Sequence, residues 1–322
     1  MKEIMLELKD ISKSFSLSKK QQHLAVNQVN LQIMQGEVLG LVGESGCGKS
    51  TLARVIMGVY APTQGEVLYK DEPLQLKRQS QRKTFAKQAQ MIFQDPYMSL
   101  DPHMTVESII GENLEIHGMN SRNMRRKRVE ELLELTGLSK EYASRFPHEF
   151  SGGQRQRIGI ARALAMNPEF VICDEPISAL DISIRSQIIN LLISLKETLN
   201  LTYLFISHDL NIVRYISDRI AVMYAGRIVE IGEAKAIYED PQHPYTKMLL
   251  DSVLVSLPDN ERLEHVTPIM GDTAGSATQI EGCPFAKRCP RVQDLCEKKN
   301  PILSEIKQEH FVSCHRIKVI EE

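Results

Sequence analysis

The sequence predicts an α/β fold in which buried strands carry functional groups at their ends, and three observations support it. A short apolar run, Val38 to Val42, is long enough for one buried strand and is followed by a glycine-rich loop and a helix-forming segment. A second apolar run ends in two acids, Asp174 and Glu175, and a third ends beside His208. Strands that alternate with helices in this way are typical of an α/β core.

Composition sets broad limits on this fold. The chain has 322 residues, of which 42% are hydrophobic and 25% are charged, as in an ordinary soluble protein with a substantial core. A net charge of -2 argues against a surface that coats a polyanion, and the basic clusters at 77–83 and 122–128 are expected to be solvated. No leader pattern is present, and no run approaches the roughly 18 apolar residues that cross a bilayer. We therefore expect a cytoplasmic chain whose six cysteines are free thiols or ligands.

The glycine-rich loop has the full pattern of a phosphate-binding loop, or P-loop. Gly43 and Gly48 enclose four residues and are followed by Lys49 and Ser50. Glycines let the backbone approach an anion, and the helix N-terminus adds partial positive charge. Lys49 is expected at the β- and γ-phosphates, and the Ser50 hydroxyl at Mg²⁺. An ordinary glycine-rich turn is the alternative, but the complete pattern predicts a nucleoside triphosphate site formed by Gly43, Glu44, Ser45, Gly46, Cys47, Gly48, Lys49, Ser50 and Thr51.

The remaining elements are read from apolar periodicity. Residues 4–40 are expected to be rich in β-structure, with a loop at 16–22, and residues 97–165 to be mostly helical and inserted into the α/β core. Phe15 is either an aromatic that stacks on a purine base or a core residue. Strands are expected at 66–69 and 90–93, and a hairpin at 220–223 and 228–232. Helices are expected at 106–116, 124–136 and 182–199, and from residue 243 onward.

Two further segments carry chemistry. Ser151, Gly152 and Gly153 precede a helical run, so they predict a helix start with exposed backbone donors, which is either a second anion site or only a well-capped helix. Asp174 ends a buried strand where P-loop ATPases hold magnesium, and Glu175 is placed to take a proton from an attacking water. Turn formation is the alternative role for these acids.

Together these residues resemble the ATP-binding subunit of an ABC transporter, and the resemblance covers about residues 4–250. It implies a P-loop NTPase (RecA-like) core with an N-terminal antiparallel β region. Phe150 stands where the family signature usually has leucine, and it leaves the donor-making residues intact. By analogy Phe15 becomes the adenine-stacking aromatic. The resemblance assigns the Q-loop to Gln94 and the signature to Phe150, Ser151, Gly152, Gly153 and Gln154. It assigns Walker B to residues 170–174 with Glu175, the D-loop to residues 178–181, which end in Asp181, and the switch histidine to His208.

The mechanism implied by this resemblance joins two such subunits head to tail. ATP lies between one P-loop and the signature segment of the other subunit. Glu175 is the general base, His208 orients the γ-phosphate, and Lys49 neutralises developing charge. The Mg²⁺ ligands are Ser50, Gln94 and Asp174.

The C-terminal region narrows the resemblance. Residues 241–247 and 282–290 are similar to the C-terminal extension of oligopeptide/dipeptide and nickel importer ATPases. We therefore expect an ATPase domain at 1–250, with the helical subdomain at 97–165, and an extension at 251–322. Four thiols in a short tail suit a soft metal or an iron–sulfur cluster, and the resemblance suggests [4Fe–4S]; four reduced cysteines are the alternative. These thiols belong to Cys283, Cys289, Cys296 and Cys314.

The expected function is ATP hydrolysis that drives import of short peptides. The resemblance implies a second ATPase subunit (more often a heterodimer than a homodimer), two permease subunits and a solute-binding protein, with this chain peripheral on the cytoplasmic face of the membrane. Nickel or another solute is an alternative cargo. A soluble ABC protein that acts on nucleic acid or ribosomes is another alternative, but the single P-loop and the absence of a long heptad run argue against it. A regulatory module without catalysis is the third, and the intact catalytic residues argue against it.

Overall fold

The structure is a computed structural model, and it describes residues 3–18, 21–75, 78–254 and 281–317. The chain divides into two compact units. The P-loop unit comprises Leu6–Ile33, Glu37–Pro73 and Ile206–Glu322. The helical unit comprises Met1–Met5, Met34–Gly36 and Leu74–Phe205. No helix in the described ranges is long and apolar enough to cross a membrane.

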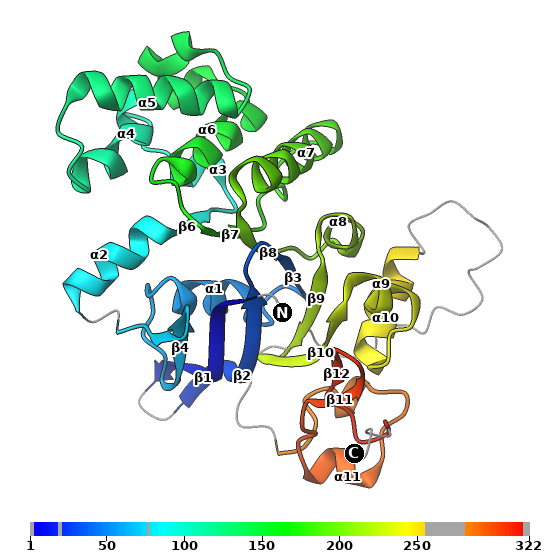
Figure 1. The fold of residues 1–322 in the computed structure, drawn as a ribbon. Coiled ribbons are helices and arrows are strands. Elements are labelled where there is room, and N and C mark those ends of the chain that lie inside the picture. The colour runs from blue at the N-terminus through cyan, green and yellow to red at the C-terminus, as the bar shows by residue number, and fades with distance from the viewer. Residues whose placement is uncertain (1–2, 19–20, 76–77, 255–280, 318–322) are drawn as a thin grey trace. The chain divides into compact units, whose positions relative to one another are not determined.

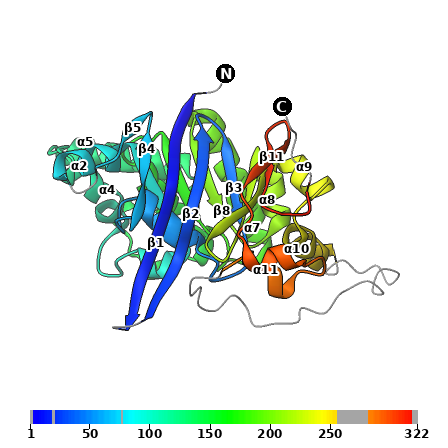
Figure 2. The same cartoon turned by 90° about the horizontal axis from the view of Figure 1, so that it is seen from below.

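The P-loop unit contains a four-stranded sheet of order β2-β1-β4-β5, in which β4 pairs antiparallel with β1 and with β5. Its strands are β1 (Ile4–Ser18), β2 (Gln21–Met34), β4 (Gln64–Tyr69) and β5 (Glu72–Pro73). Figure 2 shows β1 and β2 as two long neighbouring strands. The loop expected at 16–22 is wrong in part, because pairing of these long strands extends β1 to Ser18 and starts β2 at Gln21 despite the polar composition.

The same unit contains strands in the order β11-β12-β10-β9-β3. β3 and β9 are parallel, whereas the other neighbours are antiparallel. The β9–β10 pair is the hairpin expected at 220–232. The strands β11 and β12 of the C-terminal extension were not expected; they extend the sheet beyond β10, with Glu230 opposite Val312. The bounds are β3 (Val38–Val42), β9 (Arg219–Tyr224), β10 (Arg227–Glu233), β11 (Ser304–Lys307) and β12 (His310–Val312).

Short helices cover these strands. α8 packs on β3 and α9 on β10 (Figure 1). The helix expected from residue 243 is α10, whose first residue is Pro244, a residue that suits the first turn because its missing N–H would be unpaired there anyway. The helices of this unit are α1 (Lys49–Ile56), α8 (Leu210–Ile216), α9 (Ala234–Glu239), α10 (Pro244–Leu254), α11 (Asp294–Lys298) and the 3₁₀ turn η4 (Ala286–Arg288).

The helical unit has strands in the order β8-β7-β6, with β6 and β7 parallel. Its strands are β6 (Ala89–Ile92), β7 (Phe170–Asp174) and β8 (Thr202–Ile206). The helices expected at 106–116 and 182–199 are found with those bounds, whereas α2 was not expected. The helices are α2 (Gln79–Gln88), α3 (Pro96–Ser99), α4 (Val106–Ile116), α5 (Arg122–Leu135), α6 (Gly152–Leu164), α7 (Ile182–Leu199) and the 3₁₀ turns η1 (Lys140–Ser144) and η2 (Pro147–Glu149).

α4, α5 and α6 pack on one another and form the helical layer of this unit (Figure 1). The apolar face of α5 is buried at Val129, Leu132 and Leu133, as its amphipathic pattern predicts. α4 begins where the Thr105 hydroxyl accepts a hydrogen bond from the Ser108 N–H. Local capping and one apolar stripe therefore account for this layer.

Candidate nucleotide-binding and hydrolysis site

The P-loop joins a buried strand to a helix. All five residues of β3 are buried, and the chain then turns through residues 43–48 into α1. Gly43 and Gly48 are both sterically required. A Cβ on Gly43 would lie 2.2 Å from the Met223 carbonyl oxygen, and one on Gly48 would lie 2.2 Å from that of Ala25. Gly48 also has φ +111°, which disfavours side chains.

Lys49 lies against the loop that it follows. Its side chain is buried, and Nζ donates to the carbonyl oxygens of Gly43 at 2.7 Å and Glu44 at 2.9 Å. Cys47 packs beneath the loop, and burial raises the pKa of its thiol, so it remains protonated and structural. The ammonium group is therefore held at the loop itself, where an anionic ligand would be bound.

Two residues of the C-terminal region hold Glu44 within the same unit. The Glu44 N–H donates to Tyr245 Oη at 2.9 Å, and the Glu44 carboxylate accepts two hydrogen bonds from Arg288. No role was predicted for Tyr245 or Arg288, although both lie in the segments that carry the resemblance. Their partner is about two hundred residues away in the chain, so no local pattern could reveal the contact.

In the helical unit, β7 ends in the two acids. Asp174 is 4% exposed, and Glu175 adopts φ 47°, an uncommon conformation for a residue with a side chain. Gln94 Nε2 donates to Glu175 Oε2 at 3.1 Å. The structure therefore brings together the predicted Q-loop glutamine and the predicted general base.

The signature segment caps α6 in the way that its sequence predicts. The Ser151 hydroxyl accepts from the Gln154 N–H, and Gln154 Oε1 accepts from the Ser151 N–H at 3.0 Å, which is a capping box. Phe150 is buried in an edge-to-face contact with Tyr142, with centroids 5.3 Å apart, so it fills an apolar position as leucine would.

The D-loop and the first turn of α7 pack on this segment. A Cβ on Gly153 would lie 2.6 Å from Ile184 Cγ2, so glycine is required for the close approach. Gly152 likewise lies beside Leu180. Asp181 stands at the N-cap of α7, is exposed, and makes no capping hydrogen bond with its side chain.

Two predicted residues lie elsewhere in the P-loop unit. His208 is exposed and follows β8, directly before the aspartate that caps α8. Phe15 is half-buried and makes an edge-to-face contact with Tyr60, with centroids 5.2 Å apart. The Lys13 ammonium lies 5.2 Å from the Phe15 centroid. Adenine stacking by Phe15 stays a prediction.

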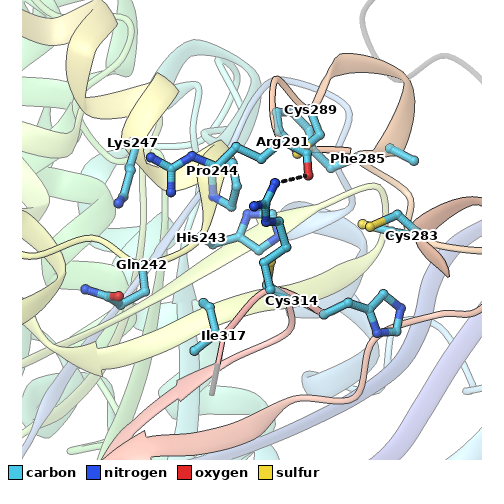
Figure 3. A pocket seen from close by; sticks show the side chains of 14 residues that line it. Gln242, His243, Pro244, Lys247, Cys283, Phe285, Cys289, Arg291, Cys314 and Ile317 are labelled. Atoms are coloured by element: carbon cyan, nitrogen blue, oxygen red, sulfur yellow. Dashed lines mark hydrogen bonds between the residues drawn. The ribbon is translucent and has the colours of Figure 1, made fainter. Parts of the chain in front are cut away.

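The four cysteines of the tail line one cavity of about 370 Å³ (Figure 3). Burial raises the pKa of Cys283 to about 11, and it also raises the pKa values of Cys289 and Cys314. Four thiols at one cavity suit a soft metal in donor type. Within the described part of the chain, however, no group of three or more His, Cys, Asp or Glu side chains is arranged to hold a metal ion. The donor set therefore fits an iron–sulfur cluster, but the arrangement is not that of an assembled ligand shell.

A buried polar cluster connects the extension to β10. Glu230 is fully buried and accepts hydrogen bonds from the N–H groups of Gln242 at 2.7 Å and His243 at 2.9 Å. His310 Nε2 lies 2.8 Å from the same carboxylate. His243 Nδ1 in turn accepts from the Tyr245 N–H at 3.1 Å, so the cluster fixes the start of α10. These contacts were not predicted from the sequence either.

This cluster predicts loss of stability in mild acid. Burial lowers the pKa of His243 from 6.5 to about 4, so the folded chain resists a proton that the unfolded chain accepts. The His243 contribution is fully present above pH 6.5 and is lost as the pH falls from 6.5 to about 4, by up to about 3 kcal/mol. His243→Asn should flatten the pH dependence of the urea unfolding midpoint in this range, whereas the same change at exposed His103 should not. An unchanged slope in His243→Asn would contradict the assignment.

Comparison with known proteins places this geometry in a class. Residues 26–178 match the ABC transporter family, and residues 229–296 match the oligopeptide/dipeptide transporter C-terminal region. The fold and the site thus define an ATP-binding cassette with ATPase activity. The putative oligopeptide transport ATP-binding protein YkfD of Bacillus subtilis is 49% identical over 312 residues, covering 97% of this chain and 95% of that protein. The oligopeptide transport ATP-binding protein OppF of the same organism is 49% identical over 317 residues, covering 98% and 97%. The chain belongs to this family of oligopeptide-type ABC transporter ATP-binding proteins.

Solved structures agree with the fold. A dimeric, post-hydrolysis structure of the ATP-binding cassette MJ0796 bound to ADP and Pi superposes with a TM-score of 0.65 at 32% identity, covering 71% of this chain and 99% of that one. The structure of cbiO1 from Clostridium perfringens, part of the ABC transporter complex cbiONQ, superposes with a TM-score of 0.66 at 27% identity, covering 80% of this chain and 96% of that one. The predicted fold class, family and ATPase activity are confirmed.

Proposed function

We propose that this chain hydrolyses ATP to power the import of oligopeptides or dipeptides through a separate membrane permease. The observation that carries the proposal is the Gln94–Glu175 hydrogen bond at the end of the buried strand β7, in a chain that also has a complete P-loop. The names of the relatives support peptides as cargo. Nickel or another solute remains the alternative cargo, since an ATPase subunit is not expected to touch the solute.

The proposed roles follow from the chemistry of each group. The P-loop N–H groups and Lys49 bind the β- and γ-phosphates, and Glu175 takes the proton of the attacking water. Gln94 reports the state of the phosphates to the permease, and His208 orients the γ-phosphate. Hydroxyl, amide and carboxylate oxygens of Ser50, Gln94 and Asp174 are the donors that Mg²⁺ prefers. Bound Mg²⁺ would supply neutralisation of phosphate charge.

A second cassette completes the proposed site. The MJ0796 cassette was solved as a dimer with ADP and Pi, which supports a head-to-tail pair here. The exposed Ser151 and the glycines beside it would contact the ATP of the partner, so ATP acts as the bridge and hydrolysis removes it. We propose a heterodimer with a related subunit at the cytoplasmic face of the membrane. Two permease subunits and a solute-binding protein complete the assembly, with the helices of residues 97–165 as the permease contact.

The experiment is reconstitution with the permease and solute-binding protein from the same source. Peptide-loaded binding protein should stimulate ATP hydrolysis, and an affinity tag on this chain should recover the permease from membranes. Stimulation by nickel but not by peptide would select the alternative cargo. Recovery of nucleic acid or ribosomes without permease would overturn the transport function.

For the cysteine cavity we infer an iron–sulfur cluster, because four cysteines line one cavity of the extension. Anaerobically purified chain should then contain iron and acid-labile sulfide in equal amounts, with visible charge-transfer absorption. Cys283→Ser should lose both, while Cys173→Ser, in β7 outside the extension, should retain both. Iron-free protein with titratable thiols would instead identify reduced cysteines that only pack the tail.

A further inference from the structure

Glu44 places a negative charge in a loop that must bind a triphosphate. Its carboxylate forms a bidentate salt bridge with the Arg288 guanidinium, in which the Nη1–Oε2 and Nη2–Oε1 distances are both 2.8 Å. The Arg288 side chain is 7% exposed and that of Glu44 is 21% exposed, so water screens the pair only weakly. Hydrogen bonding to Glu44 raises the pKa of Arg288 further above its usual range, so the guanidinium remains charged. Such planar paired contacts are strong and geometrically specific.

Tyr245 holds the backbone of the same residue. Its hydroxyl accepts from the Glu44 N–H, and the side chain is fully buried. Tyr245, Tyr224 and Phe285 form an aromatic cluster with centroid separations of 4.6, 5.3 and 5.5 Å. The Arg288 guanidinium lies 5.7 Å from the Tyr224 centroid and 5.9 Å from that of Phe285. Both groups that hold Glu44 are thus fixed by packing before any ligand binds.

The contacts reach the lysine of the loop. The Glu44 carbonyl oxygen is one of the two carbonyl oxygens that accept from Lys49 Nζ. Fixing Glu44 therefore fixes an acceptor that positions the ammonium. If Arg288 were absent, the Glu44 carboxylate would be left without its cation beside the phosphates and would repel them. Tyr245 and Arg288 lie within the C-terminal match, outside the residues matched to the ABC transporter family.

We propose that Arg288 and Tyr245 are positioning residues for the P-loop, through which the docked C-terminal region neutralises Glu44 and sets the affinity for ATP. This inference rests on the proposed role of the P-loop. If the inference is correct, the docked C-terminal region is part of the nucleotide site and is not independent of it. The cassette should then bind ATP tightly only while η4 and α10 remain in place.

The test measures ATP affinity of the full chain by isothermal titration calorimetry without Mg²⁺, so that turnover does not interfere. Arg288→Ala should weaken binding about tenfold, since an unpaired charge then faces the phosphates. The ATP affinity of Arg288→Lys should lie between those of the parent and Arg288→Ala, because lysine keeps the charge but loses the bidentate contact. Tyr245→Phe should weaken binding a few-fold. Lys287→Ala, an exposed neighbour in the same turn, should match the parent.

Charge removal separates positioning from simple packing. The effect of Arg288→Ala should shrink once the charge of Glu44 is removed, so the double variant Arg288→Ala/Glu44→Gln should bind ATP to within about threefold of Glu44→Gln alone. Thermal unfolding without nucleotide confirms that each variant is folded. A folded Arg288→Ala with parental affinity, or a double variant as weak as Arg288→Ala, would overturn the inference. A parent chain that fails to bind ATP would overturn the proposed function instead.

Discussion

A Glu175→Gln variant is expected to bind Mg²⁺-ATP like the parent and to hydrolyse it about 10²–10⁴-fold more slowly. The amide has the shape of the carboxylate but cannot accept the proton of the attacking water. Its oxygen can still accept the hydrogen bond that Gln94 Nε2 now donates to Glu175, so the local geometry should persist. Because the γ-phosphate is retained, Mg²⁺-ATP should hold two cassettes together for longer in the variant than in the parent.

Steady-state phosphate release gives the first readout, and size-exclusion chromatography of the assembled subunit with Mg²⁺-ATP gives the second. Glu197→Gln, an exposed change on α7, is the matched control and should hydrolyse ATP at the parental rate. Parental turnover in Glu175→Gln would rule out Glu175 as the base. Failure of the slow variant to pair in the presence of Mg²⁺-ATP would contradict the proposed sandwich of ATP between two subunits.

The parts of the site that the sequence predicted are those determined by local chemistry. A P-loop needs small residues at fixed spacings, and the observed approaches at Gly43 and Gly48 show why. The capping box of α6 is likewise readable from Ser151 and Gln154, three residues apart. The acids that follow a buried apolar run mark the end of β7. In each case the residues that create the feature are neighbours in the chain.

The parts that the sequence did not predict depend on residues far apart. The Glu44–Arg288 pair spans 244 positions, and the Glu230–His310 contact spans 80. Strands β11 and β12 have only four and three residues, too few to show apolar alternation, so nothing in the sequence indicated that β12 would pair with β10 and β11 with β12. The loop expected at 16–22 failed for a related reason, because strand pairing outweighed local polarity. Tertiary contacts therefore determine how the extension docks.

Lys49→Ala is the second large effect that the structure predicts, with kcat/KM for ATP lowered at least about 100-fold. Lys49 is only 5% exposed, and its ammonium donates to two carbonyl oxygens of its own loop. Its removal leaves the carbonyl oxygens of Gly43 and Glu44 without their donor, and these oxygens would then face the phosphates without an intervening cation. The loss should appear in ATP affinity as well as in turnover, because charge is neutralised in both the ground state and the transition state.

This dual loss distinguishes Lys49 from Glu175, whose replacement should spare affinity. Lys49→Arg should recover part of the affinity, since it restores a charge but not the compact geometry of the ammonium. Arg54→Ala, an exposed change in the last turn of α1, is the control for loss of a cation on the same helix. Should Lys49→Ala bind and hydrolyse ATP as the control does, the phosphates would have to be bound elsewhere. The neutralisation of Glu44 by Arg288 would then have no bearing on nucleotide affinity, because the two arguments depend on the same loop.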